Sequence, residues 1–339
     1  MEHHKDQREK TVKLLQSIKE KQTPASAKPL DLRGISLSGE DLREVDLSCV
    51  DLSNADLSGS NLSGANLFRA KLSHANLQKA NLDGTELSGA DLTAADMEEV
   101  SAINTGLGMA CMRETRLFNA NLEGSTLSKA DLEGADLRCV SLQSARVREA
   151  NLSKTDFTNA NLHGADMSLC NVNLAIFMNA VLSDTRLRLI RGYEKANWIG
   201  VDIRNINFSG AYLMRRFIVD QNYLEEFRRA SRLTAVLYYI WWLTSDCGRS
   251  LTRWFALIIL QILIFSWLYT IVGVDYGDHP TFLSPFYYSV VTLTTLGYGD
   301  IVPASAAAQV IAMLEVCLGY TMLGGLLSIL SNKMARRAD

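Results

Sequence analysis

Residues 292–300 read Thr-Leu-Thr-Thr-Leu-Gly-Tyr-Gly-Asp, a segment whose backbone is suited to binding a cation. Gly297 and Gly299 permit backbone angles that a side chain would forbid. A backbone of this kind can turn successive carbonyl oxygens toward one axis, where they replace the water shell of a potassium ion. Thr295 adds a hydroxyl oxygen at the inner end of this row of carbonyls. The segment therefore predicts a site for a dehydrated potassium ion.

Two apolar stretches of membrane-spanning length flank this segment. Residues 254–274 are 21 residues without a charge, which as a helix would extend about 31 Å, enough for one crossing. Residues 304–331 form a second apolar stretch that contains one acid, Glu315. Between them, Ser284 can cap a helix over residues 286–294 that has Pro285 at its first position. This helix is too short to cross a membrane, and its negative C-terminal end would favour a cation in the cavity that it faces.

The nine-residue match between two spanning stretches resembles the potassium-channel family over roughly residues 250–335. A Gly-Tyr-Gly tripeptide alone would indicate only a turn. The resemblance implies an all-α pore module with two transmembrane helices. One chain supplies one strand of a filter that needs four, so a homotetramer is also implied. The backbone carbonyls implied as K+ ligands are those of Thr295, Leu296, Gly297 and Tyr298, and Gly299 completes the filter.

The resemblance also implies residues that support the filter. Tyr298 is expected to point away from the axis and to pack against Tyr287 and Tyr288. In many family members a Trp at the position of Tyr287 bonds the Asp that follows the filter, here Asp300, and Tyr287 can make the same kind of bond. Val291 stands where some members carry a filter-supporting Glu. The sequence therefore does not predict how the filter behaves when the channel stays open for a long time. The expected supporting residues are Thr292, Tyr287, Tyr288 and Asp300.

Gly319 lies 22 residues after Gly297, which matches the hinge glycine in the inner helix of the family. Close helix packing is the alternative role for Gly319, and Gly324-Gly325 could bend instead. Glu315 is an acid within a spanning stretch and thus a candidate gating residue. It could instead be protonated or bonded to a hydroxyl of a neighbouring helix. No ladder of arginines at every third residue is present, so voltage sensing by charge movement is not expected. The residues expected to line the inner pore are Leu323, Leu327 and Ser331.

A repeat of five residues occupies the first half of the chain. From Leu32 to Leu187 every fifth residue is large and apolar, except Ala102. After one inserted residue, the frame resumes at Trp198, Ile203, Phe208 and Leu213. A period of five fits neither a helix nor a single strand and indicates a solenoid.

Triplets such as Ala65-Asn66-Leu67 and Ala135-Asp136-Leu137 resemble the pentapeptide-repeat family. The resemblance implies a right-handed quadrilateral β-helix with four pentads per coil, in which Leu and Ala point inward. Residues 98–108 have fewer Leu and Asp or Asn residues, so a local bulge or loop is expected there. The fold class is thus multidomain, a β-helix followed by an all-α pore module with two transmembrane helices.

These patterns predict seven segments. Residues 1–29 form an N-terminal helix that caps the first coil or contacts a neighbouring subunit. Residues 220–243 within the linker read as a helix whose aromatic end lies among lipid headgroups, with a soluble packing helix as the alternative. The segments are 1–29 (cap), 30–215 (cytoplasmic β-helix), 216–250 (amphipathic interfacial linker helix), 251–274 (outer transmembrane helix), 275–303 (turret, pore helix and filter), 304–333 (inner transmembrane helix) and 334–339 (tail).

Composition excludes several classes of function. The net charge of −3 and the pI near 6.0 give no sign of a nucleic-acid partner. Residues 31–213 hold 24 acidic and 17 basic residues, too evenly mixed for a rod that mimics DNA. Six scattered cysteines and five histidines lack metal-ligand spacing, and the cysteines indicate a reduced setting. No catalytic constellation, nucleotide fingerprint or secretory signal occurs, so neither an enzyme nor a cofactor is expected, and K+ is the permeant ion.

Charge also predicts topology. Arg249 and Arg253 precede the first spanning stretch, and Lys333, Arg336 and Arg337 follow the second, whereas residues 273–284 have no Lys or Arg. Basic residues stay inside, so both termini and the rod are cytoplasmic, in the inner membrane of a bacterial cell.

The sequence thus predicts a potassium-selective channel whose cytoplasmic rods act as a regulatory or scaffold module. The expected partners are three further copies of the chain, the lipid bilayer, K+ and an unknown cytoplasmic ligand or protein at the rods. The alternative is a membrane-anchored interaction scaffold with a non-conducting or nonselective pore module.

Overall fold

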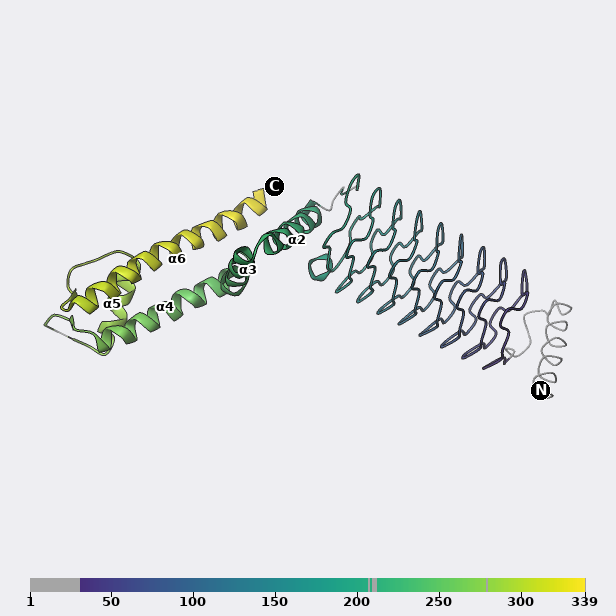
Figure 1. Ribbon diagram of the computed structural model, residues 1–339, viewed down its shortest axis with the longest axis horizontal. Helices are drawn as coiled ribbons and strands as arrows, with labels where there is room; N and C mark the ends of the chain where they lie inside the picture. The colour runs from purple at the N-terminus through teal and green to yellow at the C-terminus, as the bar shows by residue number, and fades with distance from the viewer. Residues whose placement is uncertain (1–30, 207, 209–211, 279, 339) are drawn as a thin grey trace. The chain divides into compact units, whose positions relative to one another are not determined.

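The computed structural model describes residues 31–206, 208, 212–278 and 280–338, which divide into two compact units (Figure 1). The first unit ends at Glu225 and the second begins at Glu226. The N-terminal helix predicted for residues 1–29 lies outside the described residues.

The first unit is a β-helix built from stacked coils (Figure 1). Parallel bridges join each first pentad residue to the residue twenty positions further on, from Asp31↔Asp51 to Asn171↔Arg191. Backbone hydrogen bonds such as Leu32 N to Asp51 O, at 2.8 Å, connect successive coils. A spacing of twenty residues confirms the prediction of four pentads per coil.

The interior holds the residues that the five-residue frame placed there. Leu122, Ala135 and Ala102 are all at most 1% exposed. Each pentad turns a corner through a residue with positive φ, such as Gly64 at 69° between Leu62 and Ala65. Left-handed backbone favours Gly, but Asn and other residues with side chains also occupy these corners here. Residues other than Gly are compatible with the repeat because the corner residue faces solvent, whereas the apolar positions on either side of it face the interior.

The predicted bulge or loop at residues 98–108 is wrong. Ser101↔Asn121 and Gly106↔Thr126 keep the spacing of twenty residues. Ala102 and Leu107 remain fully buried there, so the less regular outward positions do not disturb the coil. The inserted residue does have an effect: a short 3-10 helix, η1 (Tyr193–Lys195), absorbs it, and the next bridge, Ile176↔Asn197, spans twenty-one residues.

One inward side of the last coils is aromatic. The ring centroids of Phe157 and Phe177 are 4.8 Å apart and those of Phe177 and Trp198 are 4.3 Å apart, all nearly parallel. Cys170 is also buried in these coils, and burial raises the pKa of its thiol to about 12. This thiol therefore stays protonated and packs as a small apolar residue.

Helix α2 (Tyr212–Ala230) covers the open end of this coil. Met214 and Ile218 are buried in the core of the β-helix. Gln221 accepts from the Trp198 N–H through Oε1 at 2.6 Å, and Asn222 accepts from the Gly200 N–H through Oδ1 at 2.7 Å. Asn222 also donates to the Trp198 carbonyl at 2.9 Å. A solenoid end needs such a cap.

Two sequence expectations fail at this cap. Leu213, assigned to an inward pentad position, lies in α2 and is 56% exposed. The linker assigned to residues 216–250 is not one helix, because α2 ends at Ala230 and α3 (Arg232–Ser245) follows it. Ser231 caps α3 through a reciprocal pair of hydrogen bonds with Thr234. The aromatic end of α3 is exposed, with Trp241 at 40% and Trp242 at 46%.

The second unit is helical. Helix α4 (Leu251–Ile271) and helix α6 (Ala306–Ala338) are both long and apolar enough to cross a membrane. Between them lie the short helix α5 (Ser284–Leu293) and a two-stranded antiparallel ribbon of β1 (Val274–Asp275) and β2 (Val302–Pro303). The sequence did not predict this ribbon. Ser284 is also the first residue of α5 rather than its cap, and its Oγ accepts from the Thr281 N–H at 2.8 Å.

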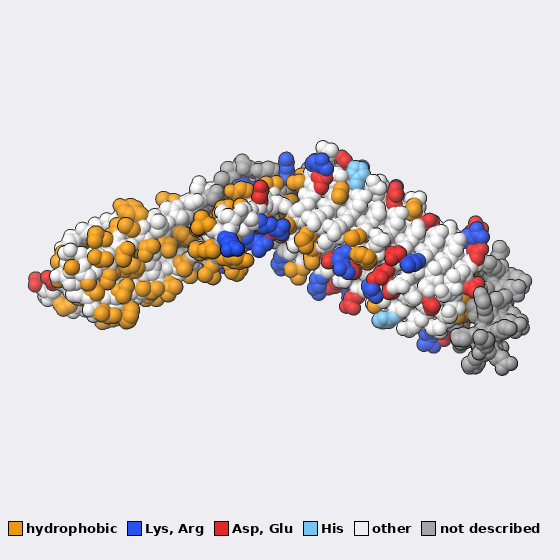
Figure 2. Space-filling model, viewed as in Figure 1, with side chains coloured by type: hydrophobic (Ala, Val, Ile, Leu, Met, Phe, Trp, Pro, Cys, Tyr) orange, Lys and Arg blue, Asp and Glu red, His pale blue; other side chains and the backbone are white. Residues whose placement is uncertain are grey.

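Apolar side chains cover the visible surface of α4, α5 and α6 (Figure 2). Ile259, Trp267 and Met313 are each more than half exposed. The β-helix instead shows charged and neutral polar side chains mixed over its surface (Figure 2). Contiguous apolar surface of this extent is unusual for a part of a protein that faces water and marks a membrane or protein contact.

Candidate functional site

The backbone of the predicted filter alternates between two conformations. Thr295, Gly297 and Gly299 have positive φ values of 57°, 51° and 78°, whereas Leu296 and Tyr298 are not among the residues with positive φ. Successive carbonyls of an extended strand point to opposite sides, and alternating left- and right-handed residues bring them toward one side. The segment thus has the backbone form that a row of carbonyl ligands requires.

Thr295 is unusual because a β-branched residue rarely adopts positive φ. Such a conformation costs about 1–2 kcal/mol. Two backbone hydrogen bonds hold this turn at the end of α5: Thr295 N donates to Thr292 O, and Leu296 N donates to Val291 O, both at 3.0 Å. The strain is therefore imposed by a fixed connection between the pore helix and the filter.

Tyr287 connects α5 to the outer end of the filter. Its Oη donates to Asp300 Oδ2 at 2.9 Å, which is the bond that the sequence led us to expect. The backbone of Asp300 also lies beside Gly277, where an added Cβ would come within 3.3 Å of the Asp300 carbonyl oxygen. A side-chain bond and a close backbone approach therefore both position Asp300.

The expected packing of Tyr298 against Tyr288 does not occur within the chain. Tyr298 is 67% exposed. Tyr288 is 7% exposed and packs edge-on against Tyr269 of α4, with ring centroids 4.6 Å apart. Tyr287 and Tyr288 are adjacent on a helix and so point about 100° apart, which lets only Tyr287 face the filter.

Glu315 ties the three helices together. It is fully buried. Tyr269 Oη of α4 donates to Glu315 Oε2 at 2.7 Å, and Ser289 Oγ of α5 donates to Glu315 Oε1. The bonding of Glu315 to a hydroxyl of a neighbouring helix, one of the possibilities that the sequence left open, is therefore present. Ser289 Oγ also lies within hydrogen-bond distance of the Ile262 carbonyl oxygen, at 3.2 Å.

Gly319 lies one turn from Glu315 on the same buried face of α6. A Cβ at Gly319 would lie 2.4 Å from the Leu293 carbonyl oxygen at the end of α5. Gly325 is equally close to α4, because a Cβ there would lie 2.2 Å from the Trp254 ring. A Cβ at Gly324 would meet nothing within 4 Å. Close packing is therefore a role of Gly319 in this structure, and α6 continues through it as one helix.

The predicted pore-lining residues of α6 are less buried than Glu315 and Gly319. Leu327 is 67% exposed, Ser331 is exposed and Leu323 is half-buried. Exposure in a single chain leaves these side chains available to line a cavity between copies.

Sequence reasoning missed several residues of the three-helix junction. Gln261, Phe265 and Tyr269 are the buried residues of α4, and their spacing of four places them on one face. Among the described residues, the side-chain amide of Gln261 is the buried group with no hydrogen-bond partner. Trp254 donates from Nε1 to the Met322 carbonyl at 2.8 Å. The signal was present as polar or aromatic residues at helical spacing in an otherwise aliphatic stretch.

Two family models match the chain. A model described as "Ion channel" matches residues 256–336. A model described as "Pentapeptide repeats" matches in eight copies between residues 31 and 190. The chain thus combines pentapeptide repeats with a C-terminal ion-channel domain, as the sequence motifs indicated.

Curated relatives match the channel domain. The chain is 35% identical over 83 residues to a calcium-gated potassium channel of Thermoplasma volcanium, which is 24% of each chain. It is 30% identical over 97 residues to two-pore potassium channel 1 of Arabidopsis thaliana, covering 28% of this chain and 27% of the relative. The chain therefore spans only about a quarter of the length of these relatives.

Solved structures match the β-helix. HetL, a pentapeptide-repeat protein of a Nostoc cyanobacterium, is 28% identical and aligns with 55% of this chain and 91% of its own, with a TM-score of 0.40. QnrB1, a plasmid-mediated fluoroquinolone resistance protein, is 20% identical over 56% of this chain and 95% of its own, with a TM-score of 0.43.

Proposed function

We propose that this protein is a potassium-selective ion channel whose pore is formed by α4, α5, α6 and the filter of four copies of the chain. The alternating backbone of residues 295–299 is the observation that carries the proposal. In that conformation the carbonyls of Thr295, Leu296, Gly297 and Tyr298 are the K+ ligands. They replace the water molecules around the ion and so compensate for the loss of its hydration shell when it enters a narrow pore.

Four copies are needed because one filter strand covers only one side of an ion. Non-helical backbone at membrane depth is tolerated only where protein or a water-filled cavity surrounds it. The exposure of Tyr298 and Leu296, at 67% and 58%, is consistent with burial between copies. Passive conduction needs no catalytic group and no cofactor.

The proposal puts the rods on the cytoplasmic side, and the basic residues that flank the two spanning helices support this orientation. Arg249 precedes α4 and Arg253 lies in its first turn, whereas the segment from Gly273 to Ser284, beyond the other end of α4, has no Lys or Arg. The relatives named as potassium channels match only about a quarter of this chain, so the proposed role of the β-helix as a regulatory or scaffold module is supported by its separate, capped fold.

The filter assignment is tested with Gly297→Ala in the full-length protein. Gly297 has φ of 51°, which an alanine adopts only with strain, so the carbonyl row should be displaced. We expect potassium flux into liposomes to fall at least about tenfold while the variant still assembles into wild-type oligomers. Gly324→Ala is the matched control, because a Cβ there meets nothing within 4 Å. Wild-type flux through the Gly297→Ala variant would refute the assignment.

A further inference from the structure

The sequence distributes charge unevenly along the first unit. Residues 31–180 contain 21 acidic and 12 basic residues, whereas residues 181–225 contain 5 acidic and 7 basic residues. The body of the β-helix is therefore acidic, and its last coil has a small excess of basic residues. Nothing in the pore requires this reversal.

The basic residues of the last coil and the start of α2 lie close together. Arg188, Arg191 and Lys195 are exposed on the last coil. The ring of Phe217 in α2 packs edge-on against Tyr193, with centroids 5.9 Å apart, and this contact brings the first turns of α2 to the segment between Arg191 and Lys195. We call this surface the basic end, and it consists of Arg188, Arg191, Lys195, Arg215 and Arg216.

No ion pair in the described part of the protein includes a residue of the basic end. The ion pairs found there include Arg186 with Asp166 and Arg204 with Asp202, but none of the five residues of the basic end. Tyr193 lies among these cations, and burial, with the neighbouring Glu194, raises the pKa of its hydroxyl. The basic end therefore presents several solvated cations within about one coil.

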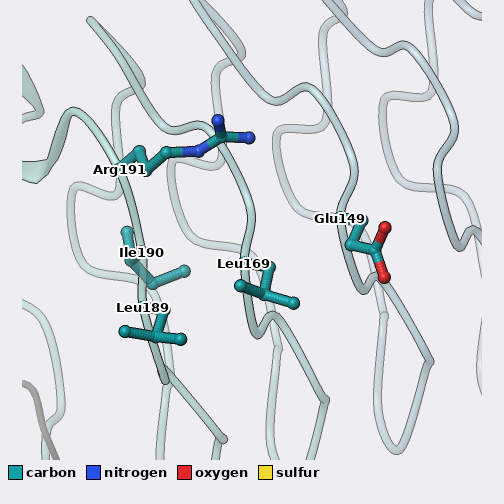
Figure 3. Close-up of a pocket in the computed structure, with 5 residues that line it drawn as sticks. All are labelled: Glu149, Leu169, Leu189, Ile190 and Arg191. Carbon is teal, nitrogen blue, oxygen red and sulfur yellow. The ribbon is translucent and has the colours of Figure 1, made fainter.

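Exposed apolar side chains accompany the cations. Leu189 is 62% exposed, Leu213 is 56% and Val219 is 50%. Figure 3 shows Leu189 and Arg191 on the last coil, with Leu169 on the neighbouring coil and Glu149 further along. Together with Ile190 they line a hollow of about 580 Å³. Cations beside exposed leucines are typical of a protein surface that binds an anionic membrane.

We propose that the basic end of the β-helix docks on the anionic phospholipid headgroups of the cytoplasmic leaflet. Charge complementarity favours this partner, since that leaflet carries a negative surface potential. The position of the basic end in the chain also favours this partner, because Arg216 precedes the first spanning helix by only 35 residues. The acidic body of the rod is repelled by the same surface, so the interaction orients the rod by its last coil. The proposal rests on the cytoplasmic placement of the rods but not on conduction.

Amine labelling of the full-length protein in lipid nanodiscs tests this contact. Lys195 is compared with Lys79, which is also exposed but belongs to the acidic body. Labelling is quantified by mass spectrometry in discs of neutral phosphatidylcholine and in discs with about one third phosphatidylglycerol. We expect Lys195 to be labelled at least about threefold more slowly in the anionic discs, with no change at Lys79. The protection should disappear in 0.5 M salt, because screening shortens the range of such attraction to a few ångströms.

Variants separate lipid docking from other causes of protection. Replacing Arg188→Gln and Arg191→Gln should abolish the protection of Lys195. The matched control, Arg69→Gln with Lys71→Gln, removes two cations from the acidic body and should leave the protection of Lys195 unchanged. Equal labelling of Lys195 in both lipids would overturn the proposal. Labelling of Lys195 that is slow in neutral discs and in detergent as well would also overturn it, and would assign the basic end to a contact with a second copy of the chain.

Discussion

Tyr269 and Glu315 form a hydrogen bond of 2.7 Å that joins the first spanning helix to the second. Ser289 adds a bond from the pore helix to the other carboxylate oxygen. The carboxylate is fully buried, in a setting where polar groups are stable only when they are hydrogen-bonded. This single side chain therefore fixes the relative positions of α4, α5 and α6 behind the filter.

Glu315→Leu should destabilise the protein, because it leaves the hydroxyl of Tyr269 without its acceptor and leaves Ser289 only the Ile262 carbonyl. An unsatisfied buried hydroxyl costs about 1–3 kcal/mol. Glu315→Gln keeps an acceptor oxygen and should lose less. Thermal unfolding of the detergent-solubilised protein measures both variants. A Leu variant that melts at the wild-type temperature would mean that the Tyr269 hydroxyl finds another partner.

Gly319→Ala should displace the pore helix, because its Cβ would lie 2.4 Å from the Leu293 carbonyl oxygen. We expect lower potassium flux and a lower unfolding temperature. Gly324→Ala is the matched control: it meets nothing within 4 Å and gains up to about 1 kcal/mol of helix propensity. If Gly319→Ala conducted normally and Gly324→Ala did not, the bending role would belong to Gly324 and the packing role of Gly319 would be unimportant for the pore.

Tyr287→Phe should weaken the outer end of the filter, since it removes the bond of 2.9 Å to Asp300. A hydrogen bond to a charged group is stronger than one between neutral groups. We expect potassium flux that decays faster or admits more sodium, measured as the ratio of the two fluxes. Asp300→Asn keeps an acceptor oxygen and should have a smaller effect. Unchanged selectivity and time course in Tyr287→Phe would show that the bond does not support the filter.

Gln221→Ala combined with Asn222→Ala should open the capped end of the β-helix. Gln221 and Asn222 accept from the backbone N–H groups of Trp198 and Gly200, so hydrogen exchange should accelerate at these two amides. Tyr223→Ala, which removes a side chain that is 62% exposed, is the control and should leave the exchange unchanged. Slow exchange in the double variant would assign the capping to Met214 and Ile218 alone.

The sequence was sufficient for the repeat because burial alone sets the period of five. The sequence was misleading where outward-facing residues were used to predict a bulge, as at residues 98–108. The coil depends only on inward-facing positions such as Ala102 and Leu107. Leu213 fits the five-residue frame by chance. The helical spacing of Met214, Ile218 and Asn222 carries the correct information, and only contact with the last coil distinguishes it from the frame.

In the pore module, the positive φ values of Gly297 and Gly299 were predictable, because glycine permits backbone angles that a side chain would forbid. The junction around Glu315 was not predictable in detail. Its partners, Tyr269 and Ser289, lie 46 and 26 residues away, and no local pattern connects them. The spacing of Gly319 from Gly297 indicated a hinge, but a glycine required for close packing has the same signature in a sequence.

The most direct test of the account is the flux of potassium and sodium into liposomes that contain the purified full-length protein, with barium as a blocker. The account predicts potassium flux that exceeds sodium flux at least about tenfold and that barium abolishes, because dehydrated carbonyl sites are selective. Equal potassium and sodium fluxes would contradict the filter assignment. Absence of flux from both the wild type and a protein that lacks residues 1–215 would contradict conduction itself.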